Sequence, residues 1–149
     1  MRQLFYFYGY RLKVIRWAHG HMPSVQTFEP NADGFAAFSE FIASYRDLST
    51  LMLVDIIEEE FHSETMPKVY GKDRQVLSRR LLDKHFRDVS HRCLLSQGRS
   101  KSGRRDELVL VGALTNADLI NPWLNVFIEN RIPLVGIQSV ATSGELLLP

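Results

Sequence analysis

The sequence predicts an α/β protein with a mixed sheet and the element order βββ-α-β-α-ββ-α-β. Three observations lead to this class. Short aromatic or alternating segments near the N-terminus indicate strands joined by tight turns. Later apolar runs of strand length alternate with segments whose apolar residues recur at helical spacing. An antiparallel meander followed by strands that return through helices is typical of a mixed sheet with helices on its faces.

The meander is predicted from three segments near the N-terminus. Leu4–Tyr8 is rich in aromatic residues, Arg11–Trp17 alternates, and Val25–Phe28 follows a polar turn. Because successive side chains of a strand point to opposite faces, each segment divides in two. In the second segment Leu12 and Val14, with Arg16 as a further candidate, lie on one face, and Lys13, Ile15 and Trp17 lie on the other. In the first segment Phe5 and Phe7 lie on one face, and Leu4, Tyr6 and Tyr8 lie on the second face. The second face needs a covering surface, which a partner protein could supply.

A helix and a central strand are predicted after the meander. Apolar residues recur at helical spacing at Phe35, Phe38, Ile42 and Tyr45. Either Asn31 or Asp33 is expected to cap the start of this helix. Thr50–Ile57 is a nearly continuous apolar run, which predicts a central strand covered on both faces. We expect residues 58–72, which are rich in glutamate, to form a polar loop closed by a proline.

The second half of the chain predicts two more helices and three strands. A helix is expected over Asp73–Phe86, followed by strands at Arg92–Gln97 and Glu107–Leu114. Pro122 either kinks the third helix or stands at its first position with Asn121 as the cap. A buried strand from Pro133 to Val140 completes the order. The apolar positions of the third helix are Leu119, Ile120, Trp123, Leu124, Phe127 and Ile128.

Length and composition favour a single domain, residues 1–149, of a soluble protein. The chain is 45% hydrophobic and carries a formal charge of +1, which argues against a strongly basic nucleic-acid binder. The lone cysteine, Cys93, excludes an intrachain disulfide and fits a reducing compartment. No apolar run approaches the roughly 20 residues that cross a bilayer, so a cytoplasmic location is expected. The apolar ending suggests an element truncated near residues 141–149, within a longer chain.

Acidic residues offer one route to catalysis. A two-metal hydrolase needs carboxylates that converge on a scissile phosphate. Asp55 lies inside the apolar run, and Glu58, Glu59, Glu60 and Glu64 follow it. Consecutive glutamates of an extended segment point alternately to opposite sides, so they cannot all bind one ion. We therefore interpret them as a solvated strand extension.

Histidine pairs and basic residues offer two other kinds of site. His19 and His21 lie in a predicted turn without a third ligand, and two ligands do not make a metal site. The loop between the strands at 92–97 and 107–114 concentrates positive charge that could bind phosphate or an acidic partner. It lacks interleaved aromatic residues, so base stacking is not supported. The candidate partner or anion surface consists of Arg99, Lys101, Arg104 and Arg105.

Three segments carry a resemblance to a known family, over about two thirds of the chain from Leu51 to Leu148. They are "LMLVDIIEEEFHSETMP", "DRQVLSRRLLDKHF" and "DELVLVGALTNADLINPWLNVFIENRIPLVGIQSV". In element order and pattern they resemble the first half of the actin-like, ribonuclease-H-like fold, and more narrowly the cytoplasmic assembly proteins PilM and general secretion protein L. The first hairpin, "FYFYGY", has the glycine but not the aspartate of the superfamily's Asp-x-Gly signature. The resemblance implies a fold and a scaffolding role, with no catalytic residue and no cofactor.

The predicted function is a non-catalytic cytoplasmic scaffold of a bacterial envelope assembly, secretion-like or pilus-like. We expect the chain to bind protein partners and not nucleic acid. A homodimer is a further possibility that the sequence leaves undecided. Membrane association would come only through a segment outside this chain. One alternative is a divergent metal- or nucleotide-dependent hydrolase that uses Asp55 and the loop glutamates. A second alternative is an anion- or nucleic-acid-binding module built on the basic loop 99–105.

Overall fold

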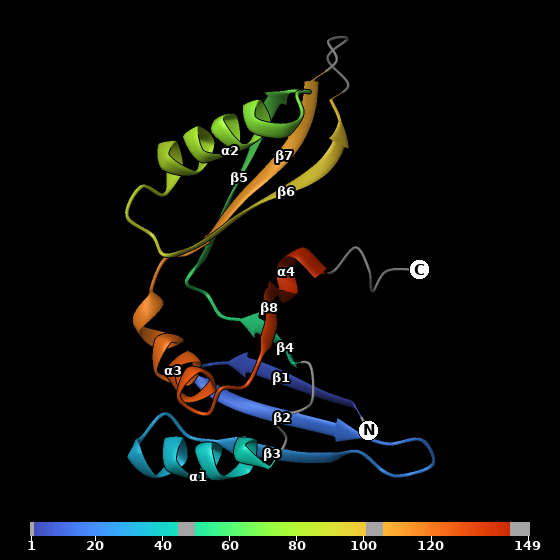
Figure 1. Cartoon of the computed structure of the whole chain (residues 1–149), viewed down its shortest axis with the longest axis vertical. Helices are drawn as coiled ribbons and strands as arrows, with labels where there is room; N and C mark the ends of the chain where they lie inside the picture. Colours follow the sequence, from blue (N-terminus) through green and yellow to red (C-terminus); the bar gives the residue numbers. More distant parts are fainter. Residues whose placement is uncertain (1, 45–49, 101–105, 144–149) are drawn as a thin grey trace. The chain divides into compact units, whose positions relative to one another are not determined.

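The computed structural model describes residues 2–44, 50–100 and 106–143, and Figure 1 shows its helices and strands. Contacts between Cα atoms divide the chain into two compact units. Unit 1 is Met1–Ile57 with Asp118–Pro149, and unit 2 is Glu58–Ala117. Unit 2 is therefore an insertion between two segments of unit 1. That residues 1–149 form a single subdomain stays a prediction.

Unit 1 is built on a five-stranded mixed sheet in the order β3-β2-β1-β4-β8. The neighbours β1 and β2 and the neighbours β2 and β3 are antiparallel, as the predicted meander requires. The neighbours β1 and β4 and the neighbours β4 and β8 are parallel, so the sheet is mixed. The strands are β1 (Arg2–Tyr8), β2 (Arg11–Trp17), β3 (Ser24–Phe28), β4 (Thr50–Asp55) and β8 (Leu134–Ser139).

The alternation predicted for the first two strands is confirmed. Phe5 pairs with Val14 and Phe7 pairs with Leu12, and all four side chains are buried on one face. Helix α1 (Ala32–Ala43) contributes Phe38 to the same core, and α3 (Asn121–Glu129) contributes the aromatic residues that meet it. This face therefore holds the aromatic core of unit 1.

Asn31 is the N-cap of α1, which resolves the choice that the sequence leaves open. Its side-chain oxygen accepts a hydrogen bond from the backbone N–H of Gly34 at 2.8 Å. Asp33 instead lies in the first turn, where a carboxylate interacts favourably with the helix dipole. The predicted apolar position Tyr45 lies outside the described residues.

Gly34→Ala is expected to destabilise unit 1 by about 1–3 kcal/mol. A Cβ at Gly34 would lie 2.0 Å from the backbone carbonyl oxygen of Glu29, so backbone rather than a flexible side chain must move. Urea unfolding followed by tryptophan fluorescence measures the loss, because Trp17 and Trp123 both belong to unit 1. Ala36→Ser, at an exposed position of α1, is the control and should change stability by less than about 0.5 kcal/mol. An unchanged stability of Gly34→Ala would contradict the close approach.

Three predictions for unit 1 are corrected. The strand at residues 50–57 is central, but only one face is fully covered, since Leu51 remains 37% exposed. The strand at residues 133–140 is an edge strand, not a buried one, and Val135 is exposed. Pro122 lies in the first turn of α3, but the N-cap is Ile120 rather than Asn121. A short 3-10 helix, η1 (Ala117–Leu119), precedes it.

Unit 2 consists of a three-stranded antiparallel sheet in the order β5-β7-β6 and one helix, α2 (Gly71–His85). The strands are β5 (Glu59–Pro67), β6 (His91–Arg99) and β7 (Asp106–Leu114). The polar loop predicted over residues 58–72 is wrong for its first part, because β5 pairs with β7 along its whole length. The predicted element order therefore lacks one strand after β4. It also lacks the short C-terminal helix α4 (Val140–Ser143).

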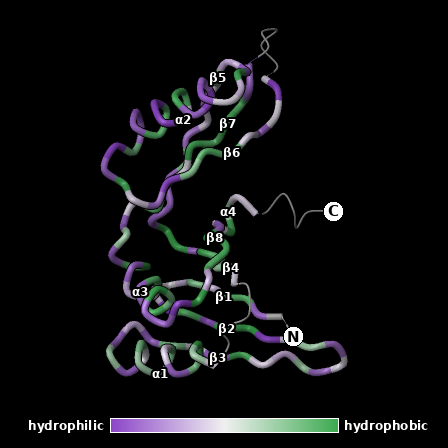
Figure 2. Tube along the Cα trace, viewed as in Figure 1, coloured by the Kyte–Doolittle hydropathy of each residue, from purple (hydrophilic) through white to green (hydrophobic). Residues whose placement is uncertain are grey.

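The core of unit 2 lies between α2 and the sheet. Phe86, Val111 and Ala113 are buried together, and the partly buried Leu81, Leu82, Val89 and Leu94 surround them. Figure 2 shows α2 as largely hydrophilic and β7 as largely hydrophobic. No residue of α2 itself is buried, so Phe86, at the C-cap, is the main large side chain that anchors this helix.

Candidate functional site

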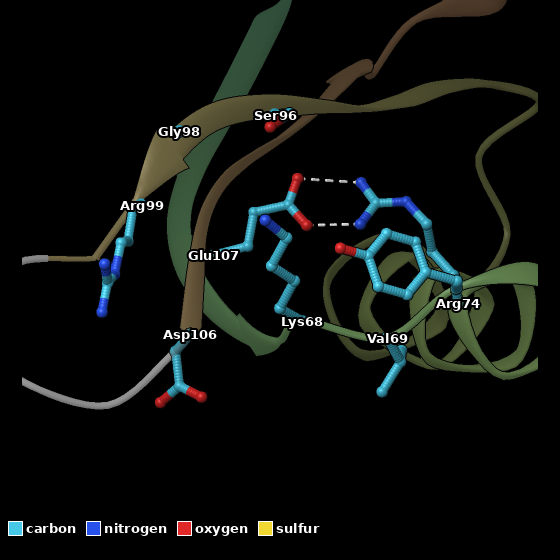
Figure 3. A pocket seen from close by; sticks show the side chains of 9 residues that line it. Lys68, Val69, Arg74, Ser96, Gly98, Arg99, Asp106 and Glu107 are labelled. Atoms are coloured by element: carbon cyan, nitrogen blue, oxygen red, sulfur yellow. Dashed lines mark hydrogen bonds and ion pairs between the residues drawn. The ribbon is translucent and has the colours of Figure 1, made fainter.

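An open groove of about 690 Å³ lies within unit 2. One wall is the segment before α2 together with its first turn, and the other wall is formed by the ends of β6 and β7 (Figure 3). The volume is in the range of ligand pockets. The lining residues are Lys68, Val69, Tyr70, Arg74, Ser96, Gly98, Arg99, Asp106 and Glu107.

An ion pair between Arg74 and Glu107 occupies this groove. The guanidinium donates two hydrogen bonds to the carboxylate, and the one from Nη2 to Oε1 measures 2.9 Å (Figure 3). The Glu107 side chain is only 12% exposed, whereas that of Arg74 is 34% exposed. Hydrogen bonds from Arg74 and Ser96, followed by the charges of Arg74 and Lys68, hold the pKa of Glu107 below its ordinary value. Arg74 therefore points from α2 toward β7 of the sheet.

A second charged cluster joins α2 to β5. Glu64 accepts hydrogen bonds from Lys84 Nζ at 2.5 Å and from His85 Nε2 at 2.7 Å, and these lower the pKa of Glu64. The His62 and His85 rings stack with centroids 4.3 Å apart and planes 20° apart. Nearly parallel imidazoles direct their ring nitrogens side by side, whereas a tetrahedral metal needs them to converge. The cluster is therefore a tether between helix and strand. In the part of the chain that the structure describes, no group of three or more His, Cys, Asp or Glu side chains is placed to hold a metal ion.

Lowering the pH is expected to destabilise unit 2. Glu64 and Glu107 have folded-state pKa values below the ordinary 4.5, so their contribution is present above that value and lost as the pH falls through the folded-state pKa. Urea unfolding followed by circular dichroism, from about pH 7 to about pH 3, measures the loss. The Glu64→Gln/Glu107→Gln double variant should be less stable at neutral pH and should depend less on pH. An identical pH dependence in both proteins would contradict this assignment.

The outer face of the unit 1 sheet carries a hydrogen bond at Asp55. The Tyr6 hydroxyl donates to the Asp55 carboxylate, the Tyr6 and Tyr8 rings stack at 5.2 Å, and Lys13 Nζ lies 4.6 Å above the Tyr8 ring centre. The hydrogen bond to Asp55, with burial and the Asp55 charge adding to it, raises the pKa of Tyr6 to about 12. Asp55 is thus engaged by a phenol, and Glu58, Glu59, Glu60 and Glu64 of the proposed hydrolase belong to unit 2.

Asp55→Asn is expected to lower the pKa of Tyr6 from about 12 toward 10.0. The neutral amide removes the charge that opposes phenolate formation. Ultraviolet absorbance of the phenolate during alkaline titration measures the shift, with Tyr6→Phe identifying the signal. Because the folded-state pKa is raised, the stabilisation is complete below pH 10.0 and is lost as the pH rises through about 12. A Tyr6 pKa that is the same with and without the Asp55 carboxylate would contradict the hydrogen bond.

The rest of the outer face of the unit 1 sheet is mainly apolar and partly open. It lies opposite the aromatic core and includes Leu51, Leu53, Ile15 and Trp17. Trp17 is 37% exposed, and Val25 of β3 is 58% exposed. Exposed apolar side chains gathered on one face are typical of protein-binding surfaces.

The sequence-predicted basic surface is only partly described. Arg99 is exposed at the end of β6 and lines the groove, whereas Lys101, Arg104 and Arg105 lie outside the described residues. Sequence reasoning missed Lys68 and Glu107 as groove residues. These two residues come together because β5 pairs with β7. The sequence-based prediction had a loop at residues 58–72 and therefore did not include this pairing.

Cys93 and the histidine turn do not form reactive sites in the described residues. Cys93 lies on β6, opposite Gly112, and although the residue is exposed, burial around the thiol raises its pKa. A raised pKa disfavours the thiolate that a nucleophile needs. His19 and His21 are exposed in the turn between β2 and β3.

Comparison with known proteins identifies the fold. No family model and no curated protein matches the chain. The PilM-PilN type IV pilus biogenesis complex contains a chain that is similar to it with a TM-score of 0.60 and 11% sequence identity, over 95% of this chain and 48% of that chain. The cytoplasmic domain of EpsL, an inner membrane component of the type II secretion system of Vibrio cholerae, is similar with a TM-score of 0.50 and 16% identity, over 91% of this chain and 56% of that one.

These comparisons confirm the actin-like fold predicted from the sequence. The chain spans about half the length of the solved structures that it matches. At 11% and 16% identity the similarity is one of fold. No helix formed by the described residues is long and apolar enough to span a membrane.

Proposed function

We propose that this chain is a non-catalytic scaffold domain that binds proteins of a bacterial envelope assembly, secretion-like or pilus-like. The observation that carries the proposal is the similarity of fold, over nearly the whole chain, to components of a pilus biogenesis complex and of a secretion system. A cytoplasmic location, with membrane association through a segment outside residues 1–149, is part of the proposal.

The described surfaces support binding rather than catalysis. Two of the carboxylates that a hydrolase would use are engaged, Asp55 by Tyr6 and Glu64 by Lys84 and His85. The open apolar face around Leu51 and Trp17 is suited to protein contact, because burying it removes apolar surface from water. Both observations favour a scaffold that recruits partners.

The hydrolase alternative makes a different prediction. An enzyme that binds Mg²⁺, Mn²⁺ or ATP is stabilised by RT ln(1 + [L]/Kd), which rises with the logarithm of the ligand concentration once that concentration exceeds Kd. We expect the melting temperature of the purified chain to stay unchanged in millimolar concentrations of each. A rise that depends on ligand concentration, and that Asp55→Asn removes, would replace the scaffold proposal with the hydrolase.

Co-isolation from membranes of the source organism tests the proposal itself. We expect the tagged chain to retain inner-membrane proteins of a pilus or secretion assembly. The Leu51→Glu/Trp17→Glu variant should retain less, because two charges enter the apolar face. Glu40→Gln, at an exposed position of α1, is the control. If the Leu51→Glu/Trp17→Glu variant and the Glu40→Gln control retain the same proteins equally, the apolar face is not the binding surface. Recovery of no envelope protein would overturn the proposal.

A further inference from the structure

We propose that the groove of unit 2 binds an extended segment of a partner protein in which a carboxylate side chain neighbours an apolar one. The proposal deepens the scaffold function and rests on it. It depends on Lys68, Tyr70, Arg74, Arg99 and Glu107.

The charge of the groove favours one additional negative group. Lys68, Arg74 and Arg99 contribute three positive charges, and Asp106 and Glu107 contribute two negative ones. Arg74 is matched by Glu107 in the bidentate pair. Among the described residues, no ion pair joins Lys68 or Arg99 to an acid. The described lining residues therefore carry an excess of one positive charge, which a single ligand carboxylate neutralises.

The chemistry of the lining favours a carboxylate over a phosphate. A phosphate carries nearly two charges and is usually held by several backbone N–H groups of a glycine-rich loop. Among the described lining residues, Gly98 is the only glycine, and two carboxylates share the groove with the cations. A phosphate would meet repulsion from Asp106 and Glu107 without a backbone cradle to offset it.

The apolar part of the groove favours a peptide over a small acid. Tyr70 is 75% exposed and lies beside Val69 at the start of α2, where no side chain caps the helix. Tyrosine rings with large exposed areas are enriched where proteins bind one another. The strand β6 is at the edge of its sheet, and its pairing with β7 shifts between Ser96 and Arg99. An extended chain can thus place an apolar side chain on Tyr70 and its neighbouring carboxylate near Arg99.

Nuclear magnetic resonance titration of the isotope-labelled chain tests the inference. The probe is a short peptide of alternating leucine and aspartate, compared with its asparagine counterpart, its phosphoserine counterpart and inorganic phosphate. At about 1 mM the aspartate peptide should shift the amide resonances of residues 68–74 and 96–99, and the asparagine peptide should not. Equal binding of the asparagine peptide, tighter binding of either phosphate probe, shifts confined to other residues, or no shift at all would overturn the proposal.

A charge-matched pair of variants locates the site. Lys68→Gln/Arg99→Gln should weaken binding of the aspartate peptide roughly fivefold, since exposed charge pairs contribute modestly. Arg79→Gln/Arg80→Gln removes the same charge from exposed positions of α2 outside the groove, and binding should change less than about twofold. Equal losses in the two variants would show attraction to the overall charge and overturn the site. Such a failure leaves the co-isolation result intact, so it is distinct from failure of the scaffold proposal.

Discussion

Phe38→Ala is expected to lower the free energy of unfolding of unit 1 by about 3–5 kcal/mol. The side chain is fully buried, and its ring meets four other aromatic rings with centroids between 5.1 and 5.9 Å away. The alanine variant loses this apolar burial and leaves a cavity between α1, α3 and the sheet. The four neighbouring rings are those of Phe5, Phe28, Trp123 and Phe127.

Urea unfolding followed by tryptophan fluorescence measures the effect of Phe38→Ala, because both tryptophans lie in unit 1. Tyr70→Ala is the matched aromatic control, since this ring is 75% exposed and belongs to unit 2. The tryptophan transition of the control should coincide with that of the unsubstituted protein. A loss below about 1 kcal/mol in Phe38→Ala would contradict a core centred on this ring.

Phe86→Ala is expected to remove most of the stability of unit 2. The substitution of a buried phenylalanine costs about 3–5 kcal/mol. A unit of this size is stable by only about 3–9 kcal/mol. Phe86 is 4% exposed, contacts the core at Val111 and Ala113, and its carbonyl oxygen accepts a hydrogen bond from Arg92. Since α2 has no buried residue of its own, the loss should release the helix from the sheet.

Hydrogen exchange distinguishes the two core substitutions. Phe86→Ala should accelerate exchange of the amides of β6 and β7, while the protected amides of β1 and β4 change little. Phe38→Ala should do the reverse. Equal acceleration in both units by both variants would show a single cooperative core and contradict the division into two units.

Several strands of unit 1 could be predicted from local sequence, because aromatic-rich, alternating and continuous apolar segments each indicate a strand. In β2, Lys13 separates Leu12 from Val14, so alternation places these two apolar residues on one face, which the structure buries. The cap at Asn31 was also predictable as one of two candidates. Asn31 rather than Asp33 is the cap because the backbone N–H of Gly34 donates to the Asn31 side chain, and this contact forms only where the folded helix begins.

The strand β5 was predicted only as a polar loop or a solvated strand extension, because its pairing partner, β7, comes from a distant part of the chain. Its α2-facing residues include His62 and Glu64, which look like a solvated loop in the sequence. In the structure Glu64 binds Lys84 and His85, so the polar face is covered by a charged helix rather than by water. The groove was missed for the same reason, since Glu107 meets Arg74 only when β7 lies under α2.

The apolar sequence pattern also could not predict how completely the faces of β4 and β8 are buried. A continuous apolar run indicates that a strand can be buried on both faces. It does not indicate which helices or loops are present to cover those faces. Leu51 is 37% exposed on the face opposite the aromatic core, and Ile137 is 41% exposed on the core face. Leu51 lies on the face at which the scaffold proposal expects contact with other proteins.

Site-specific photocrosslinking in living cells of the source organism tests the central claim most directly. A photoreactive amino acid at Leu51, on the open face of the unit 1 sheet, is compared with the same residue at Glu40, on the exposed side of α1. The scaffold account predicts an adduct from position 51, absent from position 40, that contains an inner-membrane protein of a pilus or secretion assembly. No adduct from position 51, or adducts with unrelated proteins from both positions, would contradict it.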